Sequence, residues 1–277
     1  MILEWLRAED VADDIKFING STVHAANDSL RQKLATNEKA WMIEFVATKS
    51  IWTIDLVMLL QNILSNTPRI SHNINNYDCI DQTQENDSRI CSHGCQFQLH
   101  LPNNFSYLFC STNLEVETSH NSLEYYQENF SSDEIRIQKH FRTAHEQNLP
   151  LLQTSHLSLQ VLADVISRND IAAIVLLDNS ILRNTFTSDS YSGHYVLLCG
   201  ISSDEDDLEY AQINFPDEDD NTLHYDFCIV MKNPASWKKV EYITPSIFEK
   251  AWRARGTDED IIFIAKHTRE TDLVKHL

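Results

Sequence analysis

The chain has 277 residues, of which 42% are hydrophobic and 23% are charged, and its formal net charge is −19 at pH 7. This composition is ordinary for a folded globular protein, and the length allows one large domain or two small ones. Such an excess of acidic residues repels phosphate backbones and anionic lipids, so neither nucleic-acid binding nor membrane binding is expected. Any partner is expected to be basic or neutral.

The amino-terminal sequence MILEWLRAEDVADD has no basic segment ahead of its apolar residues, so it does not resemble a secretory signal. The longest apolar runs, such as IAAIVLL, are too short to cross a bilayer. Six cysteines in a chain without such a signal favour a reducing compartment and free thiols. We therefore expect a cytoplasmic or nuclear protein.

Helices are expected first along the chain. Residues 2–17 and 29–46 have amphipathic patterns, and a third helix follows in SIWTIDLVMLLQNIL, with Ser50 or Thr53 as its N-cap. This third segment is apolar on nearly every side, which is typical of a helix buried in the centre of a domain.

Residues 66–103 change character, because they are rich in Asn, Ser, Asp and Gln. We expect a disordered insertion here that takes no part in the core. It contains residue types that zinc prefers, but the C-x3-C spacing suits a zinc site poorly and there is no second CxxC pair. The residues concerned are His72, Cys79, Cys91, His93 and Cys95. No metal or other cofactor is therefore expected.

Strands and helices then alternate. Strands are expected at 105–112, 150–154, 171–178, 194–200, 225–233 and 260–267. Helices are expected from a Ser131–Glu134 capping box to about Gln147, from an N-cap at Ser158 to near Arg168, and from Thr244-Pro245 to Gly256. The acids of 204–207 and 217–220 predict a solvated loop, and Asp258 to Asp260 are expected to be exposed. Residues 1–277 are predicted to form a single domain of the α+β class.

His194 and Asn233 are the candidate site residues. If strands 194–200 and 225–233 pair in antiparallel fashion, the start of the first lies beside the end of the second. The Asn233 amide could then accept from one nitrogen of the His194 ring and leave the other nitrogen free to act as a base. Gly193 is expected to leave open space beside the ring. The alternative is a hydrogen-bonded core histidine and an asparagine that belongs to a turn.

Four segments in this order, TKSIWTIDLVMLL, YSGHYVLLCGI, MKNPAS and ARGTDEDIIFI, resemble the guanylyl-cyclase-domain-containing family. The resemblance covers about residues 46–65 and 105–267. It implies a C39-like cysteine peptidase fold related to papain, with amino-terminal helices packed on an antiparallel-rich sheet. It also implies that His194 is the base and Asn233 the residue that orients it.

The nucleophile that this resemblance implies is absent from the sequence. The family carries it in a D-C-G-x-A-C stretch, whereas the corresponding residues 13–30 contain no cysteine and the first cysteine of the chain is Cys79. Cys199 and Cys228 each lie five residues from His194 or Asn233, about 16 Å along a strand and on its opposite face. Cys110 is expected to be buried in a strand. Ser21 and Ser29 stay open as replacements, although a serine there more commonly caps a helix.

The sequence thus predicts a catalytically impaired family member that binds a peptide or protein segment. One alternative is an active thiol hydrolase whose true amino terminus lies upstream of this sequence. The other is the guanylyl cyclase that the family name implies. The chain has no glycine-rich loop of the kind that holds a phosphate, with only 5 glycines in all.

Overall fold

A computed structural model of the chain describes residues 51–66, 105–116, 130–183, 191–216, 225–236, 238, 240–266 and 274. The helices predicted at 2–17 and 29–46 lie outside these residues, as does the insertion predicted at 66–103 apart from Asn66. The prediction of a single domain over 1–277 likewise extends beyond them.

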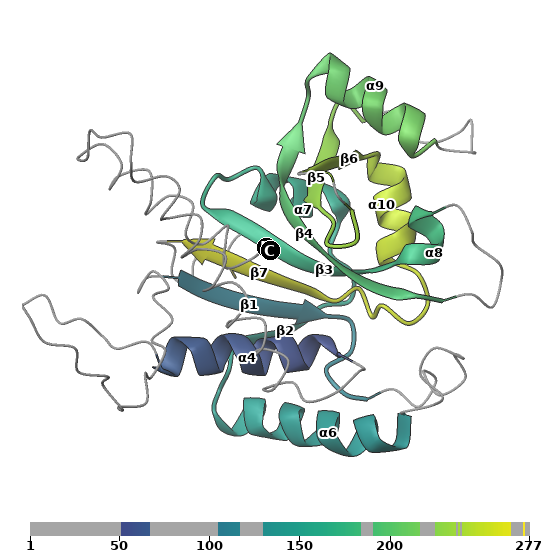
Figure 1. The fold of residues 1–277 in the computed structure, drawn as a ribbon. Helices are drawn as coiled ribbons and strands as arrows, with labels where there is room; N and C mark the ends of the chain where they lie inside the picture. The colour runs from purple at the N-terminus through teal and green to yellow at the C-terminus, as the bar shows by residue number, and fades with distance from the viewer. Residues whose placement is uncertain are drawn as a thin grey trace, which may run out of the picture.

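In the described residues, seven strands form one sheet in the order β2-β1-β7-β3-β4-β5-β6 (Figure 1). Only the β1–β2 pair is parallel, and the other neighbouring pairs are antiparallel. The strands are β1 (Phe105–Ser111), β2 (Leu151–Gln153), β3 (Ile171–Asp178), β4 (Gly193–Ser202), β5 (Cys228–Lys232), β6 (Glu241–Ile243) and β7 (Ile261–Lys266). The sheet is therefore mixed, and its assignment to the papain-like or C39-like type stays a prediction.

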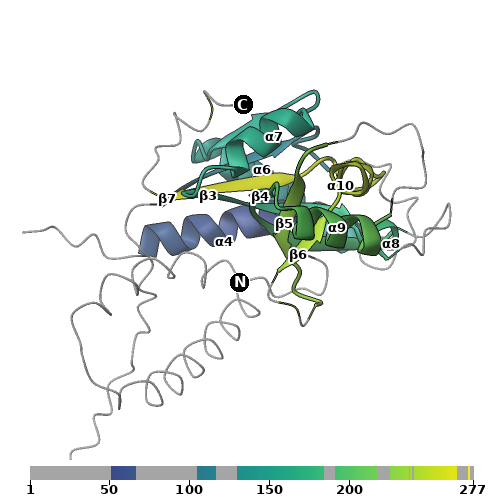
Figure 2. The same ribbon diagram turned by 90° about the horizontal axis from the view of Figure 1, so that it is seen from above.

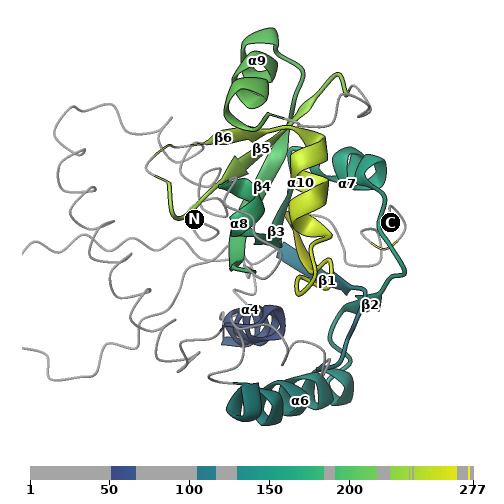
Figure 3. The same cartoon turned by 90° about the vertical axis from the view of Figure 1, so that its right-hand side faces the viewer.

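Helices cover both faces of the sheet. One apolar cluster joins α4 and α6 to β1 and β7, and a second joins α7 and α10 to β3, β4, β5 and β7. Figure 2 shows α4 and α7 on opposite sides of the sheet, and Figure 3 shows α9 beside β6 at one end. The helices are α4 (Thr53–Asn66), α6 (Phe130–Glu146), α7 (Leu159–Ile166), α8 (Asn179–Leu182), α9 (Glu205–Asn214) and α10 (Pro245–Trp252).

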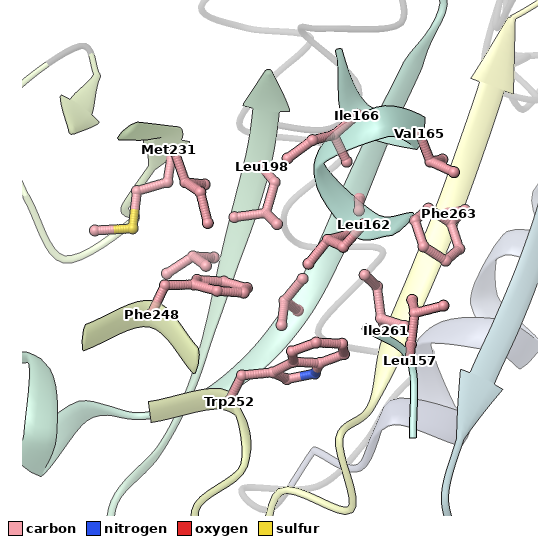
Figure 4. Packing of buried hydrophobic residues seen from close by; sticks show 14 of the residues in the cluster. Leu157, Leu162, Val165, Ile166, Leu198, Met231, Phe248, Trp252, Ile261 and Phe263 are labelled. Carbon is pink, nitrogen blue, oxygen red and sulfur yellow. The ribbon is translucent and has the colours of Figure 1, made fainter. Parts of the chain in front are cut away.

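Strands β3 and β7 lie at the centre of the sheet, and their continuous apolar sequences follow from burial on both faces. In β7, Phe263 faces the α7–α10 cluster, while Ile262 and Ile264 face α4 and α6. Figure 4 shows Phe248 and Trp252 of α10 reaching across to the side chains of α7 on the first of these faces. The core is thus two apolar layers divided by the sheet.

Of the predicted helix starts, those of α7 and α10 are present, and the caps predicted for α4 and α6 are wrong. The Ser158 hydroxyl caps α7 by accepting from the backbone N–H of Val161, and Pro245 is the first residue of α10. Ser131, by contrast, already lies inside α6, so it does not cap that helix. The third predicted helix, α4, begins at Thr53, so the cap position falls at Trp52 and the predicted N-cap at Ser50 or Thr53 is wrong. The Asp55 carboxylate, in the first turn, accepts from the backbone N–H of Trp52.

Strand β4 carries a bulge. Leu198 pairs with Met231 but Gly200 pairs with Val230, so β4 has one more residue than β5 at this point. Gly200 has a φ angle of 153°, a conformation that side-chain-bearing residues rarely adopt. The glycine therefore allows the extra residue to be accommodated.

The predicted solvated loop at 204–207 is wrong, because these acids begin helix α9. The Asp204 side chain accepts from the Asp206 backbone N–H at 3.0 Å, and three further acids occupy the first turn. Carboxylates are favourable there because the unpaired N–H groups make this end of a helix electropositive. The acids of 217–220 lie outside the described residues, and the short elements α8 and β6 were not predicted.

The predicted exposure of Asp258 to Asp260 is also wrong. Glu259 is only 9% exposed, and Asp258 and Asp260 are partly buried. The Glu259 carboxylate lies 2.6 Å from Nδ1 of His156 and 3.6 Å from the Arg253 guanidinium. His156 is 103 residues away in the chain, which is why the local sequence does not reveal the burial.

Candidate functional site

The predicted contact between His194 and Asn233 is present. His194 is the second residue of β4, and Asn233 directly follows β5. The register of this antiparallel pair places Asn233 opposite Val196, so His194 is its diagonal neighbour on the same face of the sheet. Nε2 of His194 lies 2.8 Å from Oδ1 of Asn233, within the distance of a normal hydrogen bond.

The contacts of Asn233 determine which ring nitrogen of His194 carries the proton. Oδ1 of Asn233 accepts from the Ala235 backbone N–H at 2.9 Å, and Nδ2 donates to the Glu241 carboxylate at 3.1 Å. If the amide were rotated by 180°, its NH2 group would face the Ala235 N–H and its oxygen would face the Glu241 carboxylate. Both contacts would be repulsive, so the orientation is fixed. Because Oδ1 can only accept, Nε2 of His194 must donate, so in the neutral ring Nδ1 is the nitrogen that carries the lone pair.

Glu241 is the member of this arrangement that the sequence did not predict. It is the first residue of β6, a strand of three residues at the edge of the sheet, where it pairs with Met231. A strand this short gives no periodic signal, so no pattern connected Glu241 to the site.

Ser192, just before β4, is bound by the buried carboxylate of Asp178. Oδ1 of Asp178 accepts from the backbone N–H and the hydroxyl of Ser180 and from the backbone N–H of Ser192. The space that we predicted beside Gly193 is filled, because a Cβ atom at that position would lie 2.9 Å from the Tyr191 hydroxyl. Glycine precedes the histidine because the Tyr191 ring packs there.

The opposite face of β4 meets the start of α4. The Tyr195 hydroxyl lies 3.0 Å from the Thr53 hydroxyl, which in turn donates to the Asp260 carboxylate. The segments SIWTIDL and GTDEDIIFI, quoted above as motifs, therefore meet at this point. Tyr195, rather than His194, forms the contact with the helix that contains SIWTIDL.

The three cysteines among the described residues do not supply a nucleophile. Cys110 is buried in β1, and Cys228 pairs with Ser202, eight residues along β4 from His194. Burial raises the pKa of Cys110 to about 12 and, together with the nearby Asp207 carboxylate, that of Cys228 to about 11. The pKa of Cys199 is raised by burial as well. A nucleophilic thiol needs the opposite shift, because the thiolate is the reactive form.

We expect Cys110 and Cys228 to react with iodoacetamide at pH 8 at least about 100-fold more slowly in the folded protein than in urea. The raised pKa values leave little thiolate at this pH, and the folded-state rate should increase as the pH approaches 11. Differential alkylation followed by mass spectrometry measures both rates. Fast labelling of either thiol that disappears in a His194→Ala variant would contradict this and identify an activated nucleophile.

Among the residues that the structure describes, no three His, Cys, Asp or Glu side chains are grouped so that they could hold a metal ion. The zinc-compatible residues of the predicted insertion lie outside that part of the chain. No helix in the described ranges has the length and hydrophobicity to cross a lipid bilayer.

Comparison with known proteins identifies the family to which the chain is similar. The family model described as guanylylate cyclase matches residues 99–264, a span that contains His194, Asn233 and Glu241. The chain is also 24% identical over 234 residues to "Guanylyl cyclase 1" of Arabidopsis thaliana, which covers 80% of this chain and 63% of that protein. The chain thus spans less than two thirds of this relative's length. No solved structure matches it.

Proposed function

This chain belongs to the guanylylate cyclase family, and from that premise we propose that it is a member whose His–Asn site binds a peptide or protein segment. In this proposal the fold is of the papain-like, C39-like type, and His194 and Asn233 are the base and orienting residue of a site that lacks its nucleophilic cysteine. The protein is then a binding protein built on a catalytic framework.

The observation that carries the proposal is the fixed imidazole of His194. With Nε2 donating to Asn233, Nδ1 is a hydrogen-bond acceptor held in one orientation on a partly buried ring. Such an acceptor can bind a backbone N–H or a hydroxyl of a ligand without a large loss of side-chain entropy.

The lack of a thiolate favours binding over hydrolysis. The sequence has no cysteine before Cys79, and the described cysteines are buried with raised pKa values. None of the cysteines in the described part of the chain is placed to give a proton to Nδ1 of this imidazole. The geometry of the pair is therefore retained without the step that it would serve in a peptidase.

The negative charge of the protein indicates which kind of peptide segment would bind. The net charge is −19, and the first turn of α9, which packs against β6, carries Glu205, Asp206 and Asp207. This places negative charge at the edge of the sheet to which Glu241 belongs. A basic or neutral peptide is therefore the expected ligand, because electrostatic attraction raises its rate of association.

To test the proposal, a random peptide library displayed on phage would be selected against the full chain. The affinity of the best peptide would then be measured by fluorescence anisotropy. We expect basic sequences to be enriched and the dissociation constant to rise about ten-fold or more in His194→Ala, since a buried hydrogen bond to an imidazole is lost. Ile135→Ala, on the exposed side of α6, should bind like the wild type. Affinities that are insensitive to His194 would refute the proposal.

A second candidate is nucleotide cyclisation, which the name of the Arabidopsis relative favours. In that reaction the 3′-hydroxyl of GTP attacks the α-phosphorus and pyrophosphate leaves, and a free imidazole nitrogen could accept the hydroxyl proton. We expect purified protein with GTP and magnesium or manganese to form no cyclic GMP. Product that persists through repurification and is lost in His194→Ala would assign the site to cyclisation instead.

A further inference from the structure

We propose that Glu241 is a positioning residue of this site: its carboxylate holds the Asn233 amide so that Oδ1 faces the His194 ring. The functional importance of this contact rests on the proposed function, in which the oriented imidazole binds the ligand. The contact itself can be tested without any ligand.

The three side chains form a line across three adjacent strands. Asn233 is two residues beyond Met231, and Met231 pairs with Glu241 on β6. Asn233 is thus a diagonal neighbour of Glu241 on one side and of His194 on the other. Diagonal neighbours on one face lie within reach of long side chains, as the hydrogen-bond distances of 3.1 and 2.8 Å confirm.

Glu241 provides the contact that distinguishes the two ends of the amide most strongly. The Ala235 backbone N–H also favours the observed orientation, but as a neutral hydrogen bond within a turn. The bond from Nδ2 to a carboxylate is charge-assisted and about twice as strong. It also polarises the amide, which makes Oδ1 a better acceptor for the Nε2–H of His194.

The neighbouring cation does not compete for this carboxylate. The ammonium of Lys238 binds the Tyr210 hydroxyl and lies 4.7 Å from the centre of that ring. The pKa of Lys238 is raised, first by this hydrogen bond and to a smaller extent by the charge of Glu241. The Glu241 carboxylate therefore remains available to accept from Asn233, and its charge acts on His194 by polarising the Asn233 amide.

The test is nitrogen-15 NMR of the unliganded full chain, comparing the wild type with Glu241→Gln, Glu241→Met and Glu241→Asp. In the wild type we expect an observable Nε2–H proton on His194 and slow exchange of the Asn233 side-chain amide protons. Glu241→Gln keeps an acceptor of the same length, so it should preserve both signals. Glu241→Met has no acceptor of comparable strength, so amide exchange should accelerate about ten-fold or more and the Nε2–H signal should broaden.

Glu241→Asp is the second variant, in case Glu241→Met fails to fold. It keeps the charge on the edge strand but is one methylene shorter, so we expect the same loss of the contact as in Glu241→Met. Asn233→Leu provides the reference in which the Nε2–H hydrogen bond is absent. If Glu241→Met and Glu241→Asp are folded and both signals match the wild type, Glu241 does not position the amide and the inference is wrong.

Failure of this inference is distinguishable from failure of the proposed function. Wild-type NMR signals that depend on Glu241, in a protein that selects no peptide, would support the positioning role and refute peptide binding. Peptide binding that depends on His194 but not on Glu241 would support the proposed function and refute the positioning role of Glu241.

Discussion

Replacing Trp252 with alanine is expected to lower the free energy of unfolding by about 3–5 kcal/mol, the usual cost of removing a large aromatic side chain from a core. Trp252 is 0% exposed, and its ring lies 5.7 Å from that of Phe248 in the cluster that α7 and α10 form with the sheet. The loss combines the transfer of the indole to water with the cavity left behind. Urea denaturation measures it as a shift of the midpoint at constant slope.

Trp252→Phe provides the comparison. The indole Nε1 is buried without a hydrogen-bond partner among the described residues, so the native state already includes the cost of desolvating this donor. Phenylalanine removes the donor while filling much of the volume, so it should cost less than half as much as alanine. A loss from Trp252→Phe that equals the loss from Trp252→Ala would show that Nε1 has a partner after all. Ile135→Ala, at a site that is 74% exposed, should change stability by less than about 0.5 kcal/mol.

Asp55→Ala is expected to destabilise the protein by about 3–5 kcal/mol, because it leaves a partly buried cation short of its counter-charge. Asp55 is 3% exposed at the start of α4. Its carboxylate binds the Arg136 guanidinium, lies 3.3 Å from Nε2 of His140, and accepts from the backbone N–H of Trp52. Removing it therefore breaks both the first turn of α4 and the attachment of that helix to α6. Thermal and urea unfolding report the change.

Asp55→Asn separates these two contributions. The amide oxygen can still accept from Trp52, so this variant should retain part of the stability that Asp55→Ala loses. Glu134→Gln is the matched control, since it also removes one negative charge from this region but touches only the exposed Gln138 side chain. It should cost less than about 1 kcal/mol. A cost below about 1 kcal/mol for Asp55→Ala would mean that the buried ion pairs do not stabilise the fold.

The central strands could be predicted from the sequence because burial on two faces forces a continuous apolar run. This holds for β3 and β7, whose sequences IAAIVLLD and IIFIAK need no tertiary information to be recognised. The contact between His194 and Asn233 could be predicted as well, since antiparallel pairing of β4 and β5 brings the start of one strand to the end of the other.

The parts that the sequence did not reveal were missed for different reasons. Helix α9 was missed because its acids suit a solvated loop as well as a helix start, and only the cap at Asp204 distinguishes them. Glu259 was expected to be exposed, yet its carboxylate is buried and contacts His156, 103 residues earlier in the chain. Glu241 lies on a strand too short to leave a pattern. The burial of Glu259 and the contact of Glu241 thus depend on partners in other elements, whereas α9 depends on a local cap.

The bulge in β4 has a consequence for comparing relatives of this chain. Beyond it, Gly200 pairs with Val230, and if that register continued unchanged, Asn233 would lie opposite Leu197. Leu197 and His194 are separated by an odd number of residues, so their side chains project from opposite faces. A relative that kept the full length of this segment but paired the two strands without the bulge would therefore place its imidazole and amide on opposite faces of the sheet. A relative that lost both the bulge and one residue would keep them on the same face. In a relative with an H-Y-V-L-L-C-G segment of this length, a glycine that can hold the bulge is thus as informative about the pair as the two residues themselves.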